Sequence, residues 1–120
     1  MSHAPLKAAV LIATLAYSGF GSAAAYFFKG QVTELIYQPG VFGTCMAKLN
    51  PGPQSTPANC AADFVTFSCS GDFNSKQEGA VKYSAAQLAF VTGQELKVRL
   101  DDTRKHNGFC FAVRVDNIGS

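Results

Sequence analysis

The sequence has no tryptophan and little net charge. Because the chain has ten phenylalanines and no tryptophan, we predict a hydrophobic core that depends on phenylalanine. A formal charge of +2 is far from the basic footprint of a nucleic-acid-binding protein, and we expect no nucleic-acid partner. With 48% hydrophobic and 15% charged residues, the composition is that of a globular protein and argues against disorder.

Residues that carry catalysis or bind metals are also scarce. His106 is the one histidine beyond residue 25, and no serine lies in a nucleophile-elbow pattern. No C-x-x-C pair occurs, and the cysteine spacings match no common zinc arrangement. The adjacent Asp101 and Asp102 alone lack the about six or more oxygens that calcium requires. We therefore expect no enzyme, no metal and no cofactor, and an exported hydrolase is the least favoured alternative.

Residues 1–25 follow the order of a secretory signal peptide. Lys7 precedes the apolar run Ala8 to Tyr17, and the small-residue segment Ser18 to Ala25 comes next. The run is shorter than the roughly 20 residues of a membrane span. We predict cleavage after Ala24 or Ala25, which leaves residues 26–120 as one secreted or periplasmic domain without a membrane span. An uncleaved anchor or a buried N-terminal helix is the alternative.

Four cysteines agree with export, because disulfides persist in the periplasm and outside cells but not in reducing cytosol. Four cysteines allow three pairings. We expect Cys45 to pair with Cys60, as a staple between neighbouring strands, and Cys69 to pair with Cys110, as a tie between the third strand and the last. Each closure is expected to add roughly 3–4 kcal/mol in the chain-entropy description.

Alternating apolar and polar residues predict five strands. The most regular is Glu95 to Asp101, which places Lys97 and Arg99 opposite its three aliphatic residues. In the last strand, the side chains at positions 109, 111, 113 and 115 are expected to share one face, opposite Cys110 and Ala112. The predicted segments are Phe28 to Tyr37, Thr44 to Leu49, Asp63 to Cys69, Glu95 to Asp101, and Phe109 to Asp116.

A change to helical spacing predicts one helix between Gly79 and Gly93, with Gly93 as its C-terminal stop. Its apolar face is expected at Val81, Ala85, Leu88 and Ala89, with Val91 as a candidate continuation. A polar loop from Asp102 to Gly108, with an Asn107-Gly108 step, predicts an antiparallel hairpin between the last two strands. The fold expected from this order is mostly β: a small five-stranded OB-like Greek-key barrel, disulfide-stapled, with one helix between strands three and four. A helix packed across an open sheet is the main alternative.

Two places offer candidate ligand-binding residues. At the hairpin tip, Arg104, His106 and Asn107 combine a cation, an imidazole and an amide, which suit a polar ligand. A solvated hairpin without a ligand is the alternative reading. Near the mature N-terminus, Tyr26 and Phe28 offer aromatic rings that could stack on a ligand, cover a subunit interface or complete the core.

Three segments resemble the B subunits of subtilase-type bacterial toxins and related pentamer-forming toxin B subunits. They are Val32-Thr33-Glu34-Leu35, then Cys45 and Cys60 enclosing Thr56-Pro57, and finally Thr92-Gly93-Gln94 running into Lys97 to Leu100. The resemblance implies an OB-type fold, a ring of five subunits and recognition of cell-surface sugars. One departure is Phe28, which stands where that family has a sugar-contacting serine, and a phenyl ring cannot replace the hydrogen bonds of a hydroxyl.

The sequence thus predicts an exported, non-enzymatic binding module that recognises a glycan or a protein partner. We also expect a homo-oligomer, in the manner of a ring-forming toxin B subunit. The alternative is a self-assembling structural protein of the bacterial envelope or extracellular space, whose surfaces contact other copies of the chain.

Overall fold

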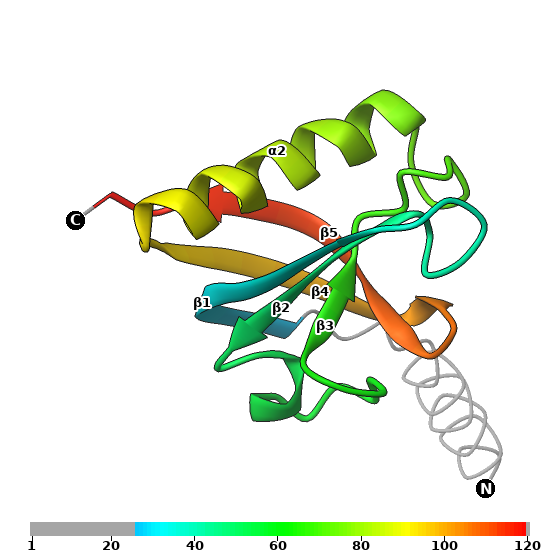
Figure 1. Cartoon of the computed structure of the whole chain (residues 1–120). Helices are drawn as coiled ribbons and strands as arrows, with labels where there is room; N and C mark the ends of the chain where they lie inside the picture. Colours follow the sequence, from blue (N-terminus) through cyan, green and yellow to red (C-terminus); the bar gives the residue numbers. More distant parts are fainter. Residues whose placement is uncertain (1–25, 120) are drawn as a thin grey trace, which may run out of the picture.

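A computed structural model describes residues 26–119 (Figure 1). The predicted signal peptide and its cleavage site lie outside these residues. The mostly β composition, the five strands, the helix between the third and fourth strands and the presence of disulfides are confirmed. In chain order the elements are β1 (Tyr26–Tyr37), β2 (Cys45–Asn50), the 3-10 turn η1 (Pro53–Ser55), β3 (Phe64–Thr66), α2 (Lys76–Thr92), β4 (Glu95–His106) and β5 (Phe109–Asn117).

The five strands form one sheet in the order β1-β2-β3-β5-β4, and it closes because β1 also pairs with β4. All neighbours are antiparallel except β3 and β5, which run parallel. Along β1, Phe28 and Val32 point into the core while Phe27 and Lys29 point outward, as strand alternation requires. The helix α2 runs along one side of this sheet (Figure 1).

The last two strands form the predicted hairpin, but its connection is shorter than expected. Both strands reach the Asn107-Gly108 step, whose φ angles of 55° and 85° are the left-handed values of a two-residue hairpin turn. The polar residues from 102 onward belong to β4, which bulges between Asp101 and Lys105. There the Asp101 carboxylate accepts a hydrogen bond from the Thr103 backbone N–H at 2.8 Å. Polar groups of this segment therefore find hydrogen-bond partners within the strand itself.

The predicted faces of β5 are wrong beyond its first residues. A register shift opposite Arg99 and Leu100 inserts Val113 as an extra residue, which changes the phase of the alternation. Cys110 and Ala112, which precede the shift, point into the core, and Val115, which follows it, packs against the same core instead of sharing the face of Phe109 and Phe111. Phe111 is also buried, but beneath side chains outside the sheet rather than in the main core.

The helix begins three residues before Gly79 and ends as predicted. Ser75 and Glu78 form a capping box at its start, and Gly93 closes its end in a left-handed conformation with φ of 71°. The predicted buried face is correct at Ala89, which is buried, and at Ala85, which packs against the core, but Val81 and Leu88 are 65% and 55% exposed. The face against the sheet carries small residues, Gly79, Ala86 and Ala89. They let the helix backbone approach closely: a Cβ on Gly79 would lie 2.9 Å from the Cys69 Cα.

The predicted disulfide pairing is also wrong. The bonds are Cys45–Cys69 and Cys60–Cys110, with Cα–Cα distances of 5.7 and 5.4 Å. β2 pairs antiparallel with β3, which brings the start of β2 beside the segment that follows β3. The long connection between β2 and β3 folds back over the hairpin, where the Ala61 N–H bonds the Gly108 carbonyl, and so places Cys60 beside β5.

Candidate functional site

A cavity of about 230 Å³ lies where three connections meet at one end of the sheet. Its wall consists of the β1–β2 loop from Gly40 to Thr44, Ser70 and Asp72 from the β3–α2 connection, and His106 and Asn107 from the hairpin. These segments are distant in sequence. The sheet brings them together because β3 pairs with the start of β2 on one side and with the start of β5, next to the hairpin turn, on the other.

The backbone around this cavity is held in unusual conformations. Outside glycine, the positive φ angles among residues 26–119 are 58° at Phe42, 79° at Thr44, 53° at Ser68 and 55° at Asn107. Phe42, Thr44 and Asn107 line the cavity, and Ser68 bonds the lining residue His106. Asn107 adopts left-handed backbone as part of the hairpin turn, but at Phe42, Thr44 and Ser68 this conformation costs free energy and persists where surrounding structure enforces it, as at many functional sites. The concentration here marks the cavity as the candidate site.

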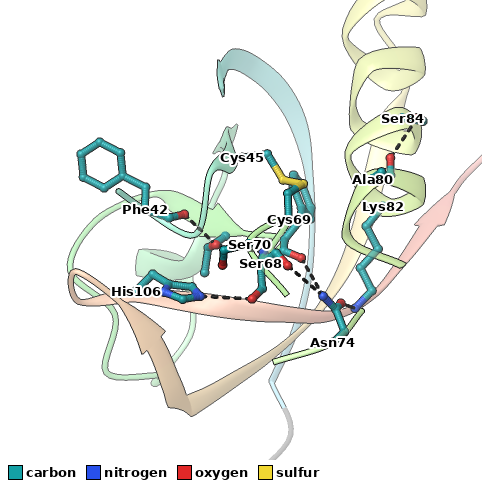
Figure 2. Close-up of a disulfide and its surroundings, with 12 residues drawn as sticks. Phe42, Cys45, Ser68, Cys69, Ser70, Asn74, Ala80, Lys82, Ser84 and His106 are labelled. Carbon is teal, nitrogen blue, oxygen red and sulfur yellow. Dashed lines mark hydrogen bonds between the residues drawn. A yellow bond between two sulfur atoms is a disulfide. The ribbon is translucent and has the colours of Figure 1, made fainter. Parts of the chain in front are cut away.

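The walls are joined to one another by hydrogen bonds. The Phe42 N–H donates to Asn107 Oδ1 at 2.9 Å, which ties the β1–β2 loop to the hairpin. The Ser70 N–H donates to the Gly43 carbonyl at 3.1 Å, and the Cys45–Cys69 disulfide (Figure 2) joins the same two segments one or two residues away. The cavity is therefore fixed before any ligand arrives, which reduces the ordering cost of binding.

His106 lies at the base of the cavity, with 16% of its side chain exposed. Its Nε2 is 3.1 Å from the Ser68 hydroxyl and 3.5 Å from Asp72 Oδ2. Figure 2 shows the His106 ring pointing toward Ser68. The ring also stacks on Phe73, with the centroids 4.5 Å apart. This set differs from a charge-relay triad, in which the carboxylate holds the ring nitrogen that faces away from the serine. Ser68 is moreover fully buried and accepts the Phe73 N–H, so the cluster positions the imidazole.

The exposed groups of the cavity are polar. Asp72 has 59% of its side chain exposed, and its Oδ2 accepts a hydrogen bond from the Ser70 hydroxyl at 2.7 Å. Asn107 is exposed at the opposite wall. A fixed carboxylate, a hydroxyl and an amide within one small cavity can accept and donate several hydrogen bonds to a polyhydroxylated ligand.

The five residues predicted to bind a ligand fall into two groups. His106 and Asn107 line the cavity. Arg104 does not: its Nε bonds Asp101 Oδ2 at 2.8 Å, and its guanidinium lies over the Phe111 ring at 4.8 Å. Phe28 is buried in the core, and Tyr26 is partly buried against it.

Sequence reasoning missed the other walls of the cavity. No sequence pattern singles out Ser70, Asp72 or the residues from Gly40 to Gly43, and Thr44 is predicted only as the first residue of a strand. Glycines at positions 40, 43 and 71 were the available signal, since each has a positive φ in the structure. Nothing in the spacing of these segments shows that they meet.

No group of three or more metal-ligating side chains occurs within residues 26–119. In the same part of the chain, no helix is long and apolar enough to cross a membrane. Comparisons with protein-family models, with curated proteins and with solved structures found no match.

Proposed function

We propose that this protein is an exported, non-enzymatic binding module whose cavity at the end of the sheet recognises a cell-surface glycan. The observation that carries the proposal is the pre-formed cavity, which presents polar groups from Asp72 and Asn107 and is framed by left-handed backbone at Phe42, Thr44 and Asn107. Its volume of about 230 Å³ suits a single sugar unit or the end of a chain better than a protein surface. The two disulfides agree with a secreted or periplasmic protein.

The topology supports the same assignment. The strand order β1-β2-β3-β5-β4, with a helix between β3 and β4, agrees with the proposed OB-like Greek-key barrel. In such barrels, the loops joining strands 1 to 2 and 4 to 5 flank the surface that binds oligosaccharides or oligonucleotides. Here those two loops supply most of the cavity wall.

The resemblance to toxin B subunits favours a sugar as the ligand class, but it implies a different position for it. The family's sugar-contacting serine corresponds to Phe28, which is only 7% exposed and therefore offers no stacking surface. The proposed cavity lies instead at the end of β4 that carries His106.

The experiment is a glycan array on the protein without its first 25 residues, followed by calorimetry with any glycan that binds. Asp72→Asn should weaken binding by roughly 10- to 100-fold, because hydrogen bonds to a charged group contribute about 1.5–3 kcal/mol. Glu95→Gln removes a carboxylate at the other end of β4 and is the matched control. Equal losses in both variants, or none in Asp72→Asn, would overturn the assignment.

A second candidate function, assembly with other copies of the chain, is favoured by the outer face of α2. Val81, Leu88 and Val91 are 65%, 55% and 81% exposed and lie at spacings of seven and three residues, which keep them on one side of the helix. The helix has no charged residue after Lys82. A helix with apolar residues on both faces is usually covered on both, and a ring-forming or self-assembling chain would cover this one.

Light scattering of the folded domain tests this second function. Replacing Val81, Leu88 and Val91 with serine should reduce an oligomer to a monomer, because these are the most exposed of the large apolar side chains of the helix. Gln77→Ser and Gln87→Ser lie on exposed positions of the same helix and serve as the control. A wild-type mass equal to that of one chain would contradict assembly through this face.

A further inference from the structure

A second surface, separate from the cavity, carries an unusual arrangement of charge. On the outer face of β1, β4 and β5, four cationic side chains lie on neighbouring strands and define what we call the cationic ladder: Lys29, Lys97, Arg99 and Arg114. Within the ladder, Lys29 is directly opposite Lys97, and Arg99 is directly opposite Arg114. Strand spacing places such partners about 5 Å apart at the backbone, and alternate residues along one strand about 7 Å apart.

Two like-charged cross-strand pairs side by side are unfavourable for the sheet, because like charges directly opposite destabilise it. Little compensates for them. Asp116 is opposite Lys97, but its Oδ1 bonds Arg114 Nε at 2.8 Å. The other ion pairs within residues 26–119 are Arg104–Asp101 and His106–Asp72, so none involves Lys29, Lys97 or Arg99. Folding of the sheet therefore does not account for this charge pattern.

Phe27 lies within the ladder, directly opposite Arg99, and is 52% exposed. Both Lys97 Nζ and the Arg99 guanidinium lie over its ring, 5.6 and 5.8 Å from the centroid. The cation–π contacts hold two long side chains in place on a surface where they would otherwise move freely. The ladder is thus a pre-ordered row of positive charge on a chain of small net charge.

We propose that the cationic ladder binds a sulfated or otherwise polyanionic polysaccharide. A linear polymer with repeated anionic groups can pair with several cations of the ladder at once, and such multivalent contacts add in affinity although each exposed pair contributes little. The proposal is independent of the cavity, which shares no residue with the ladder.

Two other polyanions fit the surface less well. Binding to an anionic membrane needs apolar side chains that enter the lipid. Phe27 is the one large apolar side chain of this face among those strongly exposed in residues 26–119, and cations flank its ring. Single-stranded nucleic acid needs a succession of aromatic platforms for its bases. A polysaccharide needs neither, since its anionic groups project from the chain and meet the cations directly.

The test measures binding to heparin, a sulfated polysaccharide, as a function of NaCl concentration. The ladder variant carries Lys29→Gln, Lys97→Gln and Arg99→Gln. The control variant carries Lys48→Gln, Lys76→Gln and Lys105→Gln, which removes the same charge from other surfaces. We expect wild-type binding that weakens with salt, a loss of about tenfold or more in affinity at ~0.1 M salt in the ladder variant, and a loss of less than about threefold in the control.

Three results would overturn the proposal. The first is equal weakening in the ladder and control variants, which would indicate net charge alone. The second is tighter binding to vesicles of anionic phospholipid, or to single-stranded DNA, than to heparin at the same salt concentration. The third is no heparin binding by the wild type. Thermal unfolding of the ladder variant at or above the wild-type temperature excludes misfolding as the cause of a loss, because the substitutions relieve like-charge pairs.

Discussion

The close packing of α2 on the sheet can be tested at Gly79, because Gly79→Ala adds one methyl group at the contact. Within a helix, Gly→Ala normally stabilises a protein by about 0.8–1 kcal/mol, since alanine restricts the unfolded chain and favours the helix. At this position the added Cβ would lie 2.9 Å from both the Phe67 carbonyl oxygen and the Cys69 Cα, and 3.0 Å from the Cys69 nitrogen. All three are backbone atoms, which cannot rotate away.

The overlap decides the sign of the effect. Overpacking a core costs typically 1–3 kcal/mol, and three backbone contacts place Gly79→Ala in the upper part of that range. After the gain in helix propensity is subtracted, we expect a net loss of roughly 1–2 kcal/mol. For a domain of this size, that loss lowers the melting temperature by roughly 5–15 °C.

The assay is thermal unfolding followed by circular dichroism, with Ser84→Ala as the control. Ser84 is on the exposed side of the same helix, so its replacement changes helix propensity without a clash, and it should raise the melting temperature slightly. A melting temperature of Gly79→Ala above that of the wild type would refute the reasoning, because it would mean that α2 does not lie against the backbone at Cys69.

Two further predictions concern stability. Replacing Cys60 and Cys110 with serine should lower the free energy of unfolding by about 4 kcal/mol, and replacing Cys45 and Cys69 by about 3.5 kcal/mol, because the two disulfides close loops of 50 and 24 residues. Urea unfolding that ranks the two pairs in the opposite order would contradict this. Acid should also destabilise the domain. Burial raises the pKa of Asp101, but hydrogen bonds from Thr103 and Arg104 outweigh it and leave the pKa below 3.8, while bonds from Ser75 lower the pKa of Glu78 below 4.5. These carboxylates stabilise the fold above their unfolded pKa values, and the stabilisation is lost as the pH falls through their folded pKa values. Asp101→Asn should therefore reduce the decrease in the urea midpoint between pH 5 and pH 3. An unchanged decrease would count against this role of Asp101.

Local patterns predicted those parts of the fold that depend on neighbours in sequence. Alternation located all five strands, the Asn107-Gly108 step located the hairpin turn, and Gly93 located the end of the helix. The errors arose where contacts between segments distant in sequence determine which residues are buried or paired. The inserted Val113 changed which residues of β5 are buried, and it depends on a register that no single strand contains.

Part of the predicted helix face and the predicted cysteine pairing were wrong for the same physical reason. An apolar residue occurs on every side of α2, so periodicity could not distinguish the face against the sheet, which only the close approach at Gly79 selects. Cysteine pairing depends on which loops the closed sheet brings together. The same applies to the candidate site: two of its residues, His106 and Asn107, could be named from the hairpin, but Asp72 meets them only in the folded chain.

Mapping of backbone amide shifts by NMR, with a glycan selected on the array, tests the central claim most directly. Glycan binding in the cavity predicts that the largest changes occur in residues 40–44, at Ser70 and Asp72, and at His106 and Asn107, with little change along α2. If the largest changes instead fall at Tyr26 and Phe28, or on the outer face of α2, the cavity is not the binding site and the account is contradicted.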